Sequence, residues 1–378
     1  MPINSLGMRL RTILNQTISL LALAACAARA GAQEDPPKRL ANIVGVAVEE
    51  YAKGIDAQGR LISAQEYSET LGFLQDARSV AERLSGDRAP AVRAVLDTLV
   101  AAVQGKVAPA RLTVIHARFV AAMGADAALD LPPGPIDLAE GQRVYETNCV
   151  ACHGERGLGD GPDAAAIHPR PPAIGRAATL ADATPALLFR VLSVGVAGTQ
   201  MPAWGSKLTA QQRWEVVSYV QSMHSTPGER LEGEGLFVQR CASCHGALGA
   251  LNGPDTRALT KLPPDVGSLE WQAERSDAQL AAMIRTGMPG TAMPPAPGLS
   301  DADVAKIVAY VRSLPARRRD VPVQLATADT SASDAARTVL AALDQSLAAA
   351  QAGRPSEAGD RAFDAYLAFE PLEGPARA

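Results

Sequence analysis

The strongest constraint on how this chain folds is an internal repeat built around two copies of Cys-x-x-Cys-His. The copies begin at Cys149 and Cys241, 92 positions apart, and a Met-Pro pair follows the histidine of each after 48 positions. The same offset aligns further short segments, namely Glu140-Gly141 with Glu232-Gly233, Pro171-Pro172 with Pro263-Pro264, and Gly198-Thr199 with Gly290-Thr291. A duplicated unit of about 90 residues therefore predicts two similar domains in tandem.

Each Cys-x-x-Cys-His motif is typical of covalent haem attachment. Two thiols on one helical turn can form thioethers with the two haem vinyl groups, and the imidazole that follows can bind the iron. A single copy can also be a redox dithiol or half of a zinc site, but the repetition favours haem. The sequence therefore predicts two covalently bound haem c groups, held by Cys149, Cys152 and His153 and by Cys241, Cys244 and His245.

The two Met-Pro pairs supply candidates for the second iron ligand. Met201 is the candidate in the first unit, while the second unit offers both Met288 and Met293. An alignment without gaps pairs Met201 with Met293, so we predict His153/Met201 and His245/Met293 ligation. A thioether opposite an imidazole raises the potential of the iron and suits outer-sphere electron transfer. The histidines outside the motifs, His116, His168 and His224, are expected to be structural or solvated.

The N-terminus indicates export. Arg9 and Arg11 precede an apolar stretch that is too short and too polar for a convincing membrane span, so residues 1–32 are expected to be a signal peptide. Cleavage after Ala32 would release a periplasmic protein, whereas cleavage before Cys26 would leave a lipid anchor on that cysteine. No other apolar run approaches the ~20 residues of a spanning helix, so no transmembrane helix is expected in the mature chain.

Periodicity elsewhere predicts an all-α chain. Residues 33–130 are expected to form a helical domain with helices near 38–56, 63–84, 88–104 and 108–123, and Ser63 with Glu66 suggests a capping box. Two helices are expected in a tail at 331–378. With 36 basic and 40 acidic side chains, the composition gives no reason to expect a nucleic-acid partner.

Within each repeat, the first and last helices are expected to cross. The helices are predicted at 137–149 and 210–223 in one unit and at 230–241 and 301–314 in the other. We expect Tyr145 to meet Tyr219, and Phe237 to meet Tyr310, at the crossings, with capping boxes at Thr209-Gln212 and Ser300-Asp303. Carbonyls of the loops at Pro171-Pro172 and Pro263-Pro264 are candidates to fix the haem-binding imidazoles.

These residues resemble class I cytochrome c domains, one at 137–226 and the other at 229–316. The matching features are the Cys-x-x-Cys-His motif, the Gly-Thr-x-Met-Pro loop and the terminal helices that carry aromatic residues. The resemblance implies an all-α fold of three or more helices around a haem with one edge near solvent. It also implies a redox partner protein.

The whole arrangement resembles the periplasmic portion of bacterial high-affinity iron permeases fused to cytochrome c. In that family a helical domain precedes the two haem units, and a segment similar to residues 362–373 leads toward the permease. The membrane helices and Arg-Glu-x-x-Glu motifs of the permease are not found in this sequence. The resemblance implies a membrane iron permease as partner and a role in iron oxidation and uptake. Acids that could bind iron are Glu49, Glu50, Glu66, Glu69, Glu370 and Glu373, but surface solvation explains each more simply.

Three classes of function are compatible with these features. The first is an electron carrier, either in iron uptake or in respiration. The second is an enzyme such as a dihaem peroxidase, which needs an open or displaceable iron position and is disfavoured by the two matched methionines. The third is a redox-sensing module whose helical flanks dock a permease.

Overall fold

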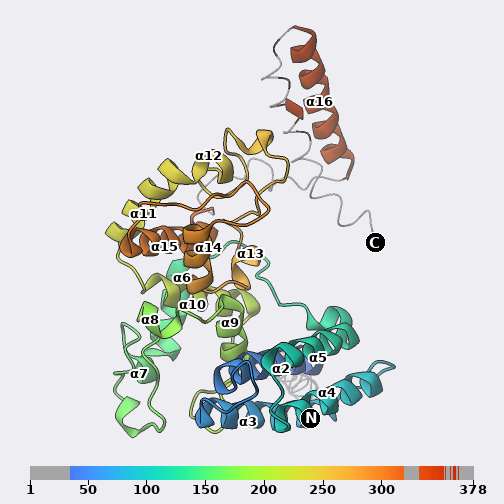
Figure 1. Ribbon diagram of the computed structural model, residues 1–378, viewed down its shortest axis with the longest axis vertical. Coiled ribbons are helices and arrows are strands. Elements are labelled where there is room, and N and C mark those ends of the chain that lie inside the picture. The colour runs from blue at the N-terminus through green and yellow to red at the C-terminus, as the bar shows by residue number, and fades with distance from the viewer. Residues whose placement is uncertain are drawn as a thin grey trace, which may run out of the picture. The chain divides into compact units, whose positions relative to one another are not determined.

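A computed structural model describes residues 35–318 and 332–352, together with positions 354, 358, 361, 362 and 365. The described ranges are helical and contain no β-strand beyond one isolated bridge between Ile55 and Leu61, which confirms the expected all-α class (Figure 1). Within these ranges no helix combines the length and hydropathy required to cross a membrane. The proposed signal peptide with Cys26, and Glu370 and Glu373 of the tail, lie outside the described residues.

Four helices form the N-terminal domain, close to where periodicity predicts them. They are α2 (Pro36–Gly54), α3 (Ala64–Ala81), α4 (Ala89–Gln104) and α5 (Pro109–Met123). Their apolar faces meet in one core that buries Leu40, Tyr51, Phe73, Leu99 and Phe119. Proline in the first turn of α2, α4 and α5 fits these starts, because the N–H that proline lacks has no partner inside a helix there.

The capping box expected at the start of α3 is only half formed. The hydroxyl of Ser63 accepts a hydrogen bond from the backbone N–H of Glu66 at 3.3 Å. The Glu66 side chain does not return to the helix start and is hydrogen-bonded to Glu50 of α2 instead. Packing between α2 and α3 therefore removes one of the two hydrogen bonds of this capping box.

The two repeats contain corresponding helices. The first unit comprises α6 (Leu138–Asn148), α7 (Val150–His153), η2 (Ala164–Ala166), α8 (Ala177–Leu180), α9 (Pro185–Val194) and α10 (Ala210–Ser222). The second comprises α11 (Pro227–Arg240), α12 (Ala242–His245), η3 (Thr256–Ala258), α13 (Leu269–Ala273), α14 (Asp277–Thr286) and α15 (Asp301–Arg317). Both predicted capping boxes, Thr209 with Gln212 and Ser300 with Asp303, are present.

The terminal helices of each unit cross at a glycine. A Cβ on Gly141 of α6 would lie 2.2 Å from the carbonyl oxygen of Glu215 in α10, and a Cβ on Gly233 of α11 would lie 2.0 Å from that of Lys306 in α15. Only glycine permits this approach. The predicted aromatic pairs meet beside the crossings: the rings of Tyr145 and Tyr219 are 5.5 Å apart, and those of Phe237 and Tyr310 are 5.3 Å apart.

Helix α9 joins the first haem unit to both of its neighbours. Arg190 on α9 forms ion pairs with Glu49 of α2 at 3.1 Å and with Glu274, which follows α13, at 3.3 Å. The two haem units also share a backbone hydrogen bond from Ala278 N to Ala181 O at 2.9 Å. The N-terminal domain and the two haem units thus pack as connected parts of one unit that ends at Arg318.

Residues from Arg319 onward belong to a separate unit, whose described helix is α16 (Ala332–Gln351). This agrees with the helix expected at the start of the tail. Leu340, Leu343 and Leu347 are exposed on α16.

Candidate functional site

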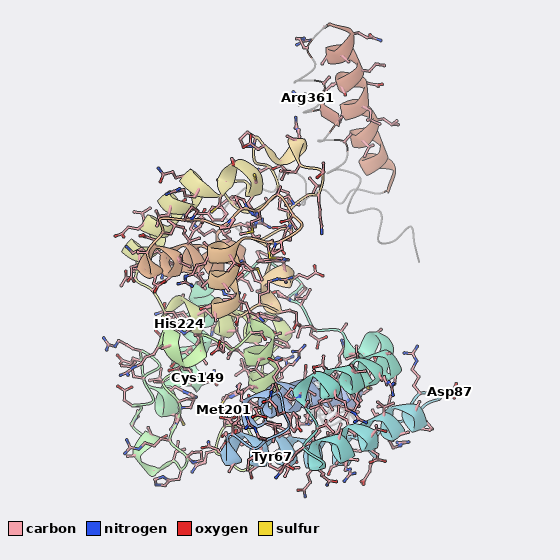
Figure 2. The ribbon with its side chains drawn as sticks, in the orientation of Figure 1. Tyr67, Asp87, Cys149, Met201, His224 and Arg361 are labelled. Atoms are coloured by element: carbon pink, nitrogen blue, oxygen red, sulfur yellow. The ribbon has the colours of Figure 1, made fainter. Side chains whose placement is uncertain are left out.

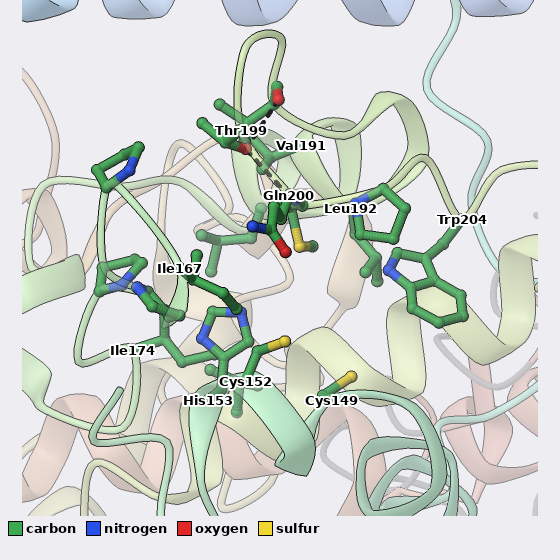
Figure 3. Close-up of a pocket in the computed structure, with 18 of the residues that line it drawn as sticks. Cys149, Cys152, His153, Ile167, Ile174, Val191, Leu192, Thr199, Gln200 and Trp204 are labelled. Atoms are coloured by element: carbon green, nitrogen blue, oxygen red, sulfur yellow. Dashed lines mark hydrogen bonds between the residues drawn. The ribbon is translucent and has the colours of Figure 1, made fainter. Parts of the chain in front are cut away.

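The candidate site of the first unit is a cavity of about 380 Å³ that brings together four predicted residues. Cys149, Cys152 and His153 lie on one side of it, at the end of α6 and in α7 (Figure 3). Met201 reaches it from the loop between α9 and α10; Figure 2 labels Met201 and Cys149 on these two separate segments. A volume of this size is within the range of cofactor sites, about 300–1,000 Å³.

The rest of the wall is mostly apolar and comes from α6, α8, α9 and α10, together with the intervening loops. It includes Tyr145, Ile167, Ile174, Leu180, Leu188, Val191, Leu192, Trp204, Val216, Val217 and Val220. An apolar wall limits water access and lowers the local dielectric, and both effects tune the potential of a bound redox centre. The cavity is therefore suited to a large apolar cofactor with a polar attachment point.

His153 is in the protonation state that binds metal. Burial lowers the pKa of its ring, although the nearby Pro172 carbonyl acts in the opposite direction. The ring is neutral at neutral pH, as a metal-binding imidazole must be. Its Nδ1 is buried and has no hydrogen bond of normal geometry in the structure. Pro172 lies in the loop where the sequence suggested an acceptor for the imidazole.

The four motif cysteines are free thiols. Burial raises the pKa of Cys149 to about 12 and that of Cys241 to about 11, so both are protonated at neutral pH. The part of the chain that the structure describes contains no group of three or more His, Cys, Asp or Glu side chains able to hold a metal ion. A structural zinc site needs four clustered ligands, which neither motif supplies by itself.

The Met201 loop has a close counterpart in the second unit. The Thr199 hydroxyl accepts a hydrogen bond from Met201 N at 3.1 Å, and the Thr291 hydroxyl accepts one from Met293 N at 3.2 Å. Each loop is also closed by a bond to the methionine carbonyl, donated by Val196 N in one unit and by Met288 N in the other, both at 3.1 Å. Met288 thus stands where Val196 does, and Met293 stands where Met201 does.

The second motif resembles the first in the burial of its histidine. Burial lowers the pKa of His245, and its Nδ1 is likewise buried without a hydrogen-bond partner in the structure. The ring of Phe237 lies 6.4 Å from that of His245. Met288 is 40% exposed, while Met293 is half-buried.

The three other histidines do not line the first cavity. His168 is exposed, and His116 stacks on Phe119 with ring centroids 6.4 Å apart. His224 lies between the two haem units, where its Nε2 is 2.9 Å from the carbonyl oxygen of Ile174. Its structural role agrees with the expectation from sequence.

The N-terminal domain contributes to the first cavity, which the motifs did not predict. Gln65, Glu66 and Glu69 of α3 line it together with the haem-binding motif. Burial, reinforced by the adjacent Glu50, raises the pKa of Glu66 to about 7. The repeat does contain a signal of this packing: Leu187 on α9 corresponds to the polar Gln279 on α14.

Helical units that bring a Cys-x-x-Cys-His motif and a looped methionine to one apolar cavity define a c-type cytochrome. The buried neutral imidazole with an unpaired Nδ1, the two free thiols beside it and the apolar wall all fit haem c. Two stretches, residues 137–220 and 228–311, match the family described as cytochrome c oxidase, cbb3-type, subunit III.

Curated relatives carry related names. The cbb3-type cytochrome c oxidase subunit FixP of Bradyrhizobium diazoefficiens is 30% identical over 223 residues, which cover 54% of this chain and 72% of that protein. FixP of Sinorhizobium medicae is 25% identical over 189 residues, covering 47% of this chain and 60% of the relative. The cbb3-type subunit CcoP of Azospirillum sp. is 27% identical over 195 residues, with 47% and 62% covered.

The chain therefore belongs to the family of cbb3-type cytochrome c oxidase subunit III and contains two of its cytochrome c domains. It spans about 60% of the length of several curated relatives. One solved chain, from the Kuenenia stuttgartiensis reducing HAO-like protein complex, is 26% identical and covers 49% of this chain and 99% of its own length. Its TM-score of 0.22 is too low to support a structural argument. The resemblance to iron permeases stays a prediction.

Proposed function

We propose that this chain is a dihaem electron-transfer protein with two His/Met-ligated haem c groups. Cys149 and Cys152 would attach the first haem, with His153 and Met201 as iron ligands. Cys241, Cys244, His245 and Met293 would do the same in the second unit. The observation that carries the proposal is the single cavity shared by Cys149, Cys152, His153 and Met201.

The residues around each site support a carrier with saturated iron coordination. When bound, each haem supplies a one-electron iron couple. Thr199 orients the backbone of Met201, and the apolar wall excludes water, which favours the reduced state over the more highly charged oxidised one. A peroxidase needs an open or displaceable iron position, so methionine ligation at both irons would argue against that activity.

The proposal includes the domain organisation and location of the chain. We propose a signal peptide at 1–32, a helical domain at 33–130, cytochrome c domains at 137–226 and 229–316, and a helical tail at 331–378. Haem c attachment and export both fit the periplasm, with a lipid anchor on Cys26 as the alternative. Because its relatives are named as oxidase subunits, we propose a terminal oxidase of the cbb3 type as the electron acceptor.

Electron transfer from iron during uptake is a second candidate, with a membrane permease as partner. One observation favours it: a helical domain packs on the first haem unit and brings Glu66 and Glu69 to its cavity. Glu49, another acid considered as an iron ligand, is engaged by Arg190 instead.

Stopped-flow reduction of the oxidised dihaem protein separates the two roles. We expect fast reduction by a reduced respiratory cytochrome or quinol-oxidising complex and slow reduction by Fe(II). Fast reduction by Fe(II), accelerated by a co-expressed iron permease, would favour iron uptake instead. Haem content of two per chain is the prior check, and its failure would contradict both roles.

A further inference from the structure

The two haem units have the same fold but differ in what covers the methionine side. In the first unit Leu187 of α9 is 3% exposed and is part of the core of the N-terminal domain. Val191, Val194 and Val196 pack against the same core. A Cβ on Gly72 of α3 would lie 3.5 Å from the Cβ of Ala197, which places α3 directly against the methionine loop.

Polar contacts hold the N-terminal domain, which forms this cover, against α9. Glu49 of α2 accepts a hydrogen bond from Arg190, in the middle of α9, at 3.1 Å. It accepts another from the hydroxyl of Thr184, at the start of α9, at 3.4 Å. The side chains of Gln65, Glu66 and Glu69 complete the cavity wall. In Figure 3 the N-terminal helices, in pale blue, run along the top edge of the view, above the loop with Thr199 and Gln200.

Among the described residues, the repeat gives no sign of such a cover on the second unit. The position matching Leu187 is Gln279, which is exposed, and the position matching Arg190 is Ala282, also exposed. Val196 is half-buried, whereas its counterpart Met288 is 40% exposed. The apolar face that binds the N-terminal domain is thus interrupted in the second unit, where Gln279 and Thr286 replace Leu187 and Val194, although the fold around it is the same.

The mouth of the second site also has a different charge. In the first unit Asn148, Pro169 and Arg170 line the cavity. The offset of 92 places Arg240, Lys261 and Leu262 at the corresponding positions, and all three are exposed. Arg240 is close enough to lower the pKa of Cys241, against the larger effect of burial. Asn148, Pro169, Arg170 and Val196 all line the first cavity, so their counterparts are expected to face the second site. That face would then combine two exposed apolar side chains, Leu262 and Met288, with two cations.

We propose that the N-terminal helical domain closes the first haem to other proteins, so that external electron exchange occurs at the face of the second haem. This face, defined by Arg240, Lys261, Leu262 and Met288, fits an electron-transfer protein with an acidic rim. An apolar centre with a charged border is the usual anatomy of such a transient interface, and complementary charge accelerates encounter. The first haem then exchanges electrons through the second. The inference rests on the proposed dihaem function.

The test is the rate at which a reduced plant-type ferredoxin, an acidic one-electron donor, reduces the full-length dihaem protein. We expect Lys261→Glu or Arg240→Glu to lower the second-order rate constant about 5- to 10-fold at low salt, with the difference shrinking at high salt. The matched control is Lys207→Glu, which makes the same charge change beside Trp204 of the first cavity. It should change the rate less than twofold.

The inference would be overturned if Lys207→Glu lowered the rate constant as much as the other two substitutions or more. It would also be overturned if none of the three substitutions changed the rate constant. Carbodiimide cross-linking of ferredoxin to the unaltered chain gives a second reading: attachment at Lys261 supports the inference, and attachment at Lys207 contradicts it. Dithionite should reduce both haems in every variant. A chain that dithionite fails to reduce would instead contradict the proposed electron-transfer function.

Discussion

The hydroxyl of Tyr310 donates a hydrogen bond to the carbonyl of Ala247 at 2.7 Å, which ties the last helix of the second unit to the loop after its haem-binding motif. In the first unit the same loop is tied by Tyr145, whose hydroxyl donates to the Gly154 carbonyl at 2.9 Å from the first helix. Phe237 occupies the position of Tyr145 and has no hydroxyl. The loop after the haem-binding motif is thus held by a tyrosine in both units, from the first helix in one unit and from the last helix in the other.

Removing the Tyr145 hydroxyl should destabilise the first unit. Tyr145→Phe removes one of two hydrogen bonds to the buried Gly154 carbonyl, which still accepts from Gly157 N at 3.1 Å. We therefore expect the free energy of unfolding to fall by about 0.5–1.5 kcal/mol, as measured by chemical denaturation. Tyr219→Phe is the control, since its ring packs against Tyr145 and its hydroxyl makes no hydrogen bond to the described residues. Equal losses in the two variants would contradict a specific role for the bond to Gly154.

The glycine at the helix crossing should tolerate no side chain. In Gly233→Ala the new Cβ would lie 2.0 Å from the Lys306 carbonyl, so α11 and α15 must separate, and we expect a loss of about 2–3 kcal/mol or more. Gly235→Ala on the same helix is the control, because nothing lies within 4 Å of its Cβ. Alanine there should stabilise the helix by up to ~1 kcal/mol. Thermal unfolding of the two variants should shift in opposite directions.

The loop geometry assigns Met293, and not Met288, as the counterpart of Met201. Met293→Ala should therefore abolish the thioether-to-iron absorption of the second haem in the oxidised protein and lower its potential. Met288→Ala should leave both unchanged, because that side chain occupies the place of Val196 and is 40% exposed. The reverse result, loss with Met288→Ala only, would show that the loop rearranges around the haem.

Glu66 should make stability depend on pH. Burial raises its pKa in the folded chain from 4.5 to about 7. Between these two values the folded state holds more protons than the unfolded state, so stability falls as pH rises through this window. Glu66→Gln removes the effect: the variant should match the parent near pH 5 and unfold at a higher temperature near pH 8.

The control for Glu66 is Glu69→Gln, one turn away on α3 and also at the cavity. Glu69 has the smallest effect among the groups that shift the pKa of Glu66, so this variant should keep most of the pH dependence of the parent chain. A gap between parent and Glu66→Gln that is as large at pH 5 as at pH 8 would contradict a proton held on Glu66 in the folded state.

The cover over the first haem depends on Leu187, which is buried in the core of the N-terminal domain. Leu187→Ala should cost about 2–5 kcal/mol, the usual range when a buried leucine is truncated. Gln279→Glu changes the matching exposed position of α14 but keeps a side-chain acceptor for Ser276 N, so it should stay within about 0.5 kcal/mol of the parent. Denaturant unfolding of both variants measures these losses. If the Leu187 variant lost as little stability as the control, α9 would not be held by its packing against the N-terminal domain.

The sequence by itself determined the elements that depend on local chemistry or on a strict interval. Helix starts followed from prolines and hydroxyl caps, as at Thr209 and Ser300, because capping involves residues three positions apart. The repeat interval identified the two haem-binding units, and the ungapped register paired Met293 with Met201. The aromatic pairs at the helix crossings, Tyr145 with Tyr219 and Phe237 with Tyr310, followed from aligning whole units.

Only the tertiary structure decided what depends on contacts between distant segments. Glu66 had the spacing of a capping box, yet its side chain is shared with Glu50 because α2 packs beside α3. The cover on the first haem depends on α9 meeting α2, with Glu49 and Thr184 135 positions apart in the chain. Such contacts depend on the packing of whole surfaces, which no local pattern of residue types encodes. For the same physical reason, two copies of one motif have unlike surroundings.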